Sequence, residues 1–185
     1  MVEHRESIWA KLFILAAIIQ GLIALVITGW LIIPGLLPAE PSRVIAAGGA
    51  GTWLLAGYLG YLVVGVIGVA VTALFYHFLE VIQRRTFGTV NKTLAGAHLL
   101  GMNIGIAGAM WLMMLAGYRG GAAMLAEEFG GLGASSYGAH LIIYEVLGGS
   151  TYILGGFIGL LAIGVFIGGI GYVFAMTRKA EPIIV

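Results

Sequence analysis

The chain has 185 residues, of which 61% are hydrophobic and 9% are charged, and its mean hydropathy is +1.06. A soluble domain of this length could not bury so much apolar surface, so the composition predicts a membrane protein. The net charge of +1 gives no support to a nucleic-acid partner. Because the chain contains no cysteine, it can form no disulfide, thiolate zinc site, iron–sulfur cluster or covalent c-type haem of its own.

Four apolar runs are long enough to cross a bilayer, because about 20 residues with a rise of roughly 1.5 Å each span a hydrocarbon core of about 30 Å. They predict transmembrane helices at about residues 12–37, 52–79, 94–118 and 151–176, within a single membrane domain covering residues 1–185. The predicted fold class is therefore an all-α polytopic membrane protein. The first run is too long for the apolar part of a signal peptide and leads into Pro34 and Pro38, so we interpret it as a retained helix.

The connections between these runs differ in composition. Residues 38–51 are rich in proline and small residues, which predicts a loop. Residues 83–93 carry cations and no acid, so we expect them to lie in water beside the headgroups. Residues 119–150 contain apolar patches that are too short to span, so we expect an external loop with a short interfacial helix around residues 122–129.

The distribution of positive charge predicts the orientation in the membrane. With four crossings, most cations fall on the side that holds both termini. The positive-inside rule therefore places both termini in the cytoplasm (N-in/C-in) of a multi-pass protein of the cell membrane. The cations of that side are Arg5, Lys11, Arg84, Arg85, Lys92, Arg178 and Lys179, against Arg43 and Arg119 on the other side.

Glycine spacing in the last two runs indicates close helix packing. Small residues three or four positions apart let helix backbones approach each other where lipid gives no hydrophobic incentive to associate. We expect the last helix to be packed on more than one side and to meet another subunit; packing within the bundle alone is the alternative. The predicted packing positions are Gly101, Gly105, Gly108, Gly155, Gly159, Gly164 and Gly168.

His77 and His98 are the candidate ligands for a cofactor. They flank the basic connection on adjacent predicted helices and would lie at similar depth. Two imidazoles from two helices ligate b-type haem in this way, so one interpretation is a small b-type cytochrome that exchanges electrons with quinol. The other interpretation is that both histidines serve as hydrogen-bonding or lipid-facing groups near the headgroups and that the chain holds no cofactor.

Other polar residues of the apolar runs favour structural roles. Asn103 lies deep in its run and is expected to bond to a carbonyl or polar side chain of a neighbouring helix. Glu80 is spaced to pair with Arg84 one turn later. Tyr58 and Tyr61 fit an aromatic belt at the external membrane interface.

Motifs for catalysis are missing from the sequence, which has no Ser/His/Asp set, no phosphate-binding glycine loop and no HExxH segment. On the external side, His140, Tyr144 and Glu145 form a group that is interpreted as a solvated loop cluster, with metal binding or proton relay as the alternative. A small channel or carrier is a further alternative, although the predicted spans lack an ionisable residue near the bilayer centre. We therefore expect no catalytic residue and no metal site in this chain.

The last three predicted helices resemble the last three helices of the catalytic subunit of haem–copper oxidases. The resemblance covers about residues 52–179 and is carried by the segments GYLGYLVVGVIGVAVTALFYHFLE and HLLGMNIGIAGAMWLMMLAGYRGG, succeeded by an external loop, a final helix and a basic tail. In that family, a Gly-His-x-His-like segment supplies haem ligands and a Gly-x-Pro-Arg-Arg-like turn ends the next helix. Residues 57–61 and 116–121 occupy these two places here.

This chain departs from the family at the ligand positions, where Tyr58, Gly60 and Tyr61 stand in place of histidine. It also lacks the family's other helices. The resemblance therefore implies a shortened, ligand-free relative that packs beside a catalytic subunit, with haem and copper in that partner and no cofactor in this chain. The expected function is a non-catalytic accessory subunit of a respiratory terminal oxidase, in contact with other membrane subunits and lipids.

Overall fold

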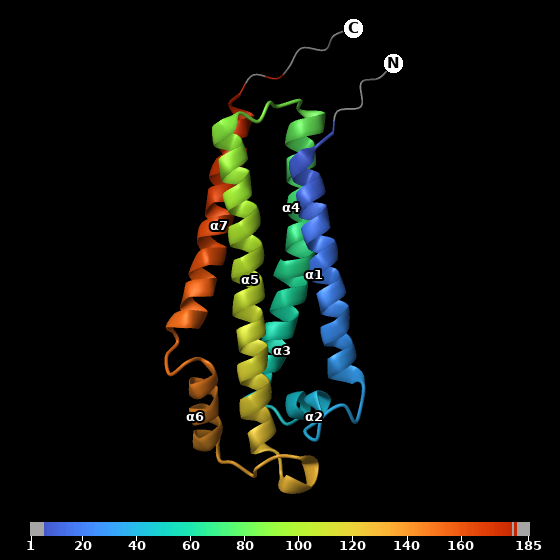
Figure 1. Ribbon diagram of the computed structural model, residues 1–185, viewed down its shortest axis with the longest axis vertical. Coiled ribbons are helices and arrows are strands. Elements are labelled where there is room, and N and C mark those ends of the chain that lie inside the picture. Colours follow the sequence, from blue (N-terminus) through green and yellow to red (C-terminus); the bar gives the residue numbers. More distant parts are fainter. Residues whose placement is uncertain (1–5, 179, 181–185) are drawn as a thin grey trace.

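The computed structural model describes residues 6–178 and residue 180, and in it the chain forms an all-α bundle of four long helical spans (Figure 1). All four spans are long and apolar enough to cross a membrane, so the protein is a multi-pass membrane protein. The first, third and fourth spans are the helices α1 (Ile8–Ile32), α5 (Thr89–Met124) and α7 (Tyr152–Met176). The second span is continuous from Gly51 to Ile82 and contains several helical segments.

The first span begins and ends earlier than its hydropathy predicts. The side chain of Ser7 accepts a hydrogen bond from the backbone N–H of Ala10 and so caps the start of α1. At the other end, Ile33 is extended because it precedes Pro34, which has no N–H to continue the helical ladder. The expected helix at about residues 12–37 is therefore a helix at residues 8–32.

The second span alternates between α-helical and π-helical segments. Its α-helical parts are α3 (Gly51–Gly60) and α4 (Val69–His77), and its π-helical parts are η1 (Tyr61–Gly68) and η2 (Phe78–Ile82). A π-helical segment has more residues per turn than an α-helix, so it changes which side chains face the core on either side of it.

The connections contain more helix than the sequence suggested. The expected loop at residues 38–51 holds a short helix, α2 (Pro41–Ala46), which starts on a proline and buries Val44 against Gly51 and Gly121. The expected interfacial helix around residues 122–129 is instead the end of α5 followed by a 3-10 turn, η3 (Glu127–Phe129). The helix of this region is α6 (Ser136–Val146), which is capped by Ser135.

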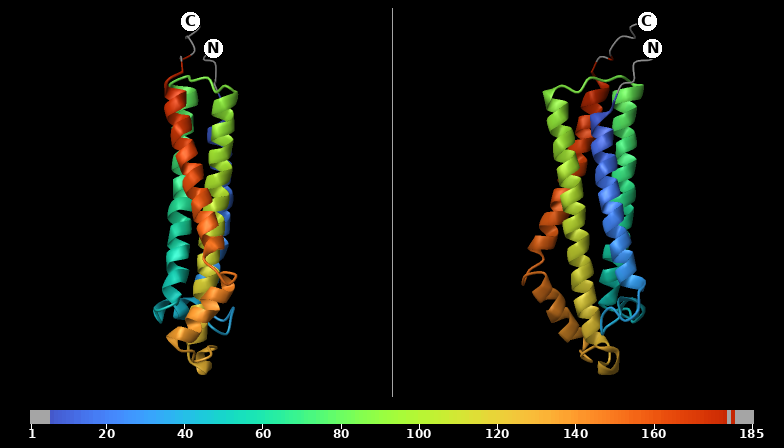
Figure 2. Two further views of the ribbon diagram at one scale, coloured as in Figure 1. Left: turned by 90° about the vertical axis from the view of Figure 1, so that its left-hand side faces the viewer. Right: turned by 45° about the vertical axis from the view of Figure 1, so that its right-hand side comes forward.

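The third span organises the bundle. Helix α5 contacts α7 along most of its length and also packs against α3 and α6, whereas α1 packs mainly against α4 and η1 (Figure 1). Helix α7 lies against α5 in every view and has little contact with the α1 side of the molecule (Figure 2). One face of α7 is therefore covered by α5, and the opposite face is left open by the described residues.

One end of the bundle collects positive charge, and we call it the basic end. The start of α1, the connection from η2 to α5 and the end of α7 all lie there (Figure 1). A guanidinium N–H of Arg85 donates a hydrogen bond to the backbone carbonyl of Arg178, and Arg85 also forms an isolated bridge with Ala180. These contacts tie the connection before α5 to the end of α7. The cations on the described elements of this end are Lys11, Arg84, Arg85, Lys92 and Arg178.

Candidate functional site

The contact between α5 and α7 is made where glycines let the two backbones meet. A Cβ atom on Gly101 would lie 2.8 Å from the Cα of Gly164, closer than real side chains approach. Gly105 and Gly108 of α5 pack in the same way against Leu161 and Phe157 of α7. The absence of side chains at these positions allows the close approach that drives helix association in lipid.

The other predicted packing glycines of α7 are divided between the face that contacts α5 and the open face. Gly168 packs directly against the imidazole of His98 on α5. By contrast, Gly155 and Gly159 have no described neighbour within 4 Å of the position a Cβ would take, and the same holds for Gly169. Thus five of the seven predicted glycines serve the contact between α5 and α7, and two lie on the open side of α7.

These open positions belong to one continuous helix face, which we call the outer face of α7. With about 100° of rotation per residue, Gly155, Gly159 and Ile170 fall on the same side of the helix. The buried positions of α7, including Gly164 and Ala175, fall on the opposite side and face α5. The outer face is apolar, with Phe166 70% exposed in the bundle, and its half away from the basic end carries the small residues Gly155, Gly159 and Ala162 beside the exposed Ile163.

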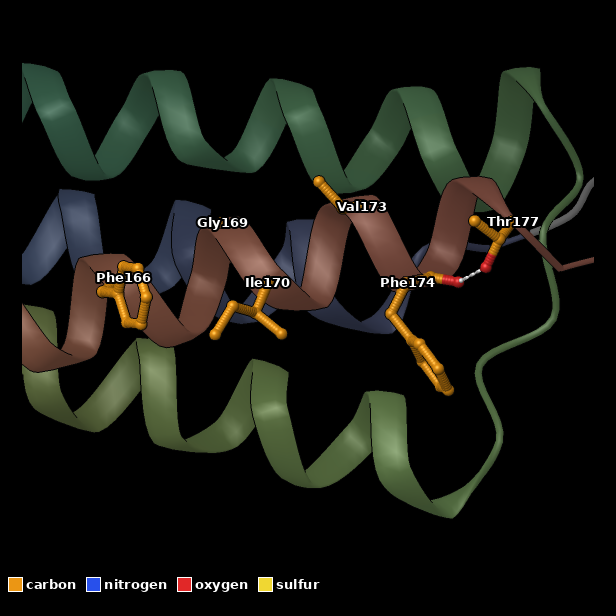
Figure 3. Close-up of a pocket in the computed structure, with 6 residues that line it drawn as sticks. All are labelled: Phe166, Gly169, Ile170, Val173, Phe174 and Thr177. Carbon is orange, nitrogen blue, oxygen red and sulfur yellow. Dashed lines mark hydrogen bonds between the residues drawn. The ribbon is translucent and has the colours of Figure 1, made fainter.

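A groove of about 540 Å³ runs along the half of the outer face that is nearer the basic end (Figure 3). Its floor is at Gly169, and its walls are aromatic and branched aliphatic side chains of the same helix. The side chains drawn in Figure 3 project from α7 on the side away from the bundle interior. The lining residues are Phe166, Gly169, Ile170, Val173, Phe174 and Thr177.

The two candidate haem ligands lie in different environments. His98 is 3% exposed, and its Nδ1 atom is 3.2 Å from the hydroxyl of Tyr76. His77 is the next residue after Tyr76 on α4 but has an exposed side chain. The interior partner of His98 on the second span is therefore Tyr76, and no described contact joins the two histidines.

The imidazole of His98 lies in a cluster of rings. The ring centres of Phe13, Tyr76 and Tyr172 lie 5.1, 6.0 and 5.8 Å from that of His98, and the backbone of α7 at Gly168 closes another side. Side chains of this chain thus fill the space around the imidazole. The arrangement suits a core histidine that links α5 to α1, α4 and α7.

A polar network that the sequence did not reveal crosses the interior of the bundle. The hydroxyl of Tyr61 donates to the side-chain oxygen of Gln20, and the Gln20 amide donates to Oδ1 of Asn103 at 3.1 Å. The Asn103 amide in turn donates to the carbonyl of Leu99 at 2.8 Å. The expectation that Asn103 bonds to a neighbouring helix is confirmed, and its partner is Gln20 of α1.

The structure corrects the prediction that Tyr61 belongs to an interfacial aromatic belt. Tyr61 is fully buried, because it starts the π-helical segment η1 and turns inward to Gln20. Tyr58, one turn earlier, is partly buried, and its hydroxyl lies 2.8 Å from that of Thr28 on α1. Gln20 could have indicated this contact from the sequence, because it is the single amide within the first apolar run and an amide in a membrane needs a hydrogen-bond partner.

Glu80 is a buried carboxylate near the basic end. Its carboxylate accepts hydrogen bonds from the hydroxyl of Ser7 and from the backbone N–H of Trp9, the latter at 3.3 Å. Because Ser7 also caps α1, these bonds join the first turn of α1 to η2. Glu80 and Arg84 each have further interactions, and the ion pair between them stays a prediction.

Two buried polar groups near this end are unsatisfied within the described part of the chain. Neither amide atom of Asn91 has a hydrogen-bond partner there, although the residue is 2% exposed, and the hydroxyl of Tyr172 is also without one. Asn91 lies on the same stripe of α5 as His98, two turns closer to the helix start. An unpaired buried amide is costly, so Asn91 is the most unusual polar residue of the interior.

At the opposite end, α6 carries the group that was interpreted as a loop cluster. His140, Tyr144 and Glu145 have exposed side chains on this helix. His140 and Trp53 line a pocket of about 260 Å³ between α6 and the start of the second span. Within the described residues, no three His, Cys, Asp or Glu side chains gather closely enough to hold a metal ion.

No family model, curated protein or solved structure matches this chain. Its function is therefore inferred from the geometry of the bundle and from the resemblance in its sequence.

Proposed function

We propose that this protein is a non-catalytic accessory subunit of a larger membrane enzyme, and that a partner helix packs on the half of the outer face of α7 that holds Gly155 and Gly159. The observation that carries the proposal is the open row of small residues at Gly155 and Gly159. Exposed glycine gains nothing from lipid, whereas it lets a second helix approach closely. Close packing through glycine also joins the opposite face of α7 to α5, where Gly101 contacts Gly164.

The polar interior supports a structural role. The bonds of Gln20 to Tyr61 and Asn103 join three spans to one another. The contact of Tyr76 with His98 joins the second span to α5 in the same way. Interior groups that are occupied in holding helices together are less suited to a redox centre than to a rigid scaffold. This favours the accessory subunit over the small b-type cytochrome.

The type of enzyme comes from the sequence resemblance alone. It suggests a haem–copper terminal oxidase of a respiratory chain, with haem and copper held by the partner subunit. The chain would then present α7 to the catalytic subunit and fix the position of α5 behind it. The accessory role does not depend on this choice of enzyme.

Purification of the tagged chain from its native membranes in a mild detergent tests the proposal. We expect it to carry along other membrane subunits and to bring haem absorption and copper with them. Gly159→Leu should release these subunits, because the larger side chain keeps the partner helix away. Gly29→Leu is the matched control, since among the described residues only the end of the Ile33 side chain lies within 4 Å of the position of a Cβ there. A chain that migrates alone overturns the accessory role, and a metal-free partner overturns only the oxidase assignment.

A further inference from the structure

We propose that the groove on the outer face of α7 binds an anionic phospholipid, with an acyl chain along the groove and the phosphate at Arg178. The groove begins at Phe166 and ends at Thr177, next to Arg178. This inference does not depend on the accessory role, because the groove is formed by α7 alone and needs no partner subunit.

The length of the groove matches one leaflet of a bilayer. From Phe166 to Thr177 the helix rises by about 16 Å at roughly 1.5 Å per residue. A hydrocarbon core of about 30 Å contains two leaflets of about half that depth each. An acyl chain that starts at the membrane surface beside Thr177 would therefore end near Phe166.

The shape and the lining of the groove suit a hydrocarbon chain. Gly169 leaves the floor open, since no described atom lies within 4 Å of the position a Cβ would occupy. The walls include Ile170, and the side chain of Val173 is 65% exposed in the bundle. The one hydroxyl of the lining belongs to Thr177, and it is occupied by the carbonyl of Phe174 at 2.8 Å (Figure 3).

The mouth of the groove carries a positive charge in a fixed position. The guanidinium carbon of Arg178 lies 4.7 Å from the ring centre of Phe174, which is itself a wall of the groove. Arg85 donates to the carbonyl of Arg178 and so brings a second guanidinium to the end of α7. In the described part of the chain, no carboxylate lies within ion-pair distance of Arg178. A guanidinium presents paired N–H donors that fit phosphate oxygens.

The positive charge at the mouth of the groove favours an anionic lipid over a zwitterionic lipid. A zwitterionic lipid carries its own cation next to the phosphate, whereas an anionic headgroup such as phosphatidylglycerol has a net negative charge to place beside Arg178 and Arg85. A partner helix would fill the apolar groove equally well but would have to bring an acidic residue to the same point. We therefore assign the groove to the anionic lipid.

Native mass spectrometry of the purified chain tests this assignment with phosphatidylglycerol and phosphatidylcholine of identical acyl chains. We expect the wild-type chain to retain phosphatidylglycerol about fivefold better than phosphatidylcholine, the preference that one arginine near a surface supplies. Arg178→Gln should lower this preference, because only Arg85 then remains beside the headgroup, and Arg178→Lys should keep most of it. Arg119→Gln, at the other end of α5, is the control and should leave the preference unchanged.

Gly169→Leu tests the groove separately from the charge, and thermal unfolding shows whether each variant is folded. Filling the floor should lower the retention of both lipids, whereas water-soluble glycerol phosphate should not compete with the lipid at the same concentration. Equal retention of the two lipids by the wild-type chain overturns the proposal. Unchanged lipid retention by a folded Gly169→Leu or Arg178→Gln variant also overturns the proposal. A Gly169→Leu variant that loses a protein partner but keeps its lipid would overturn it as well.

Discussion

Gly101 of α5 and Gly164 of α7 face each other across the contact between the two helices, and a Cβ on Gly101 would lie 2.8 Å from the Cα of Gly164. Gly101→Val should therefore push the helices apart and lower the free energy of unfolding by about 1–3 kcal/mol, the usual cost of overpacking. Gly156→Val is the control, because this glycine has no described neighbour within 4 Å of its Cβ position. Thermal unfolding in detergent measures both. Equal stability of the two variants would show that α5 and α7 do not pack through Gly101.

The bond between Tyr61 and Gln20 should stabilise the bundle by a modest amount. Interhelical hydrogen bonds in membranes contribute about 0.6 kcal/mol on average and up to about 1.7 kcal/mol. A double-mutant cycle of Tyr61→Phe and Gln20→Leu, measured by equilibrium unfolding, should give a coupling energy in this range. Tyr152→Phe is the control, since Tyr152 is 85% exposed. Additive effects of the two interior changes would contradict the bond.

Asn91 and Asn103 allow a comparison of one residue type on one helix. Asn103 bonds to Gln20 and to Leu99, whereas the amide of Asn91 has no described partner. Asn91→Leu should raise the unfolding temperature, because removing an unsatisfied buried amide recovers a penalty of about 1–3 kcal/mol. Asn103→Leu should lower it, since Gln20 then loses its acceptor. If Asn91→Leu also destabilises the protein, the Asn91 amide is bonded to a water, a ligand or another chain.

The two histidines should behave differently when each is changed to alanine. His98→Ala leaves a hole among Phe13, Tyr76 and Tyr172, so it should lower the unfolding temperature. His77→Ala should have little effect, because this side chain is exposed. Neither variant should change the visible absorption spectrum of the isolated chain. A reduced haem b band that disappears in both variants would instead support the small b-type cytochrome.

The sequence predicted the four spans because apolar runs of this length are stable as helices that cross a membrane, and the structure confirms their number. Their boundaries were less predictable. Hydropathy reports only the apolar part of a helix, whereas α5 continues through Asn91 and Arg119 to Met124 with its polar residues included. A short helix such as α6 is visible only in its pattern, where Ala139, Ile143 and Leu147 recur every fourth residue and are all buried.

Helix rotation was the main property that the sequence did not reveal. The second span passes beside His98, but Tyr76 faces the interior and His77 does not. The same holds for Tyr61, which depth alone assigned to the membrane interface. Rotation depends on the π-helical segments η1 and η2 and on the neighbours of the span, and neither can be read from the periodicity of one apolar run.

Photo-cross-linking from the outer face of α7 is the most direct test of the proposed role. The chain has no cysteine, so Gly159→Cys creates a single thiol for a photoactivatable maleimide in native membranes. We expect an adduct with a different membrane subunit, identified by mass spectrometry as one that binds haem and copper. Ile18→Cys, on the exposed side of α1, should give no such adduct. Adducts of Gly159→Cys with lipid alone, or with a second copy of this chain alone, would contradict the accessory role.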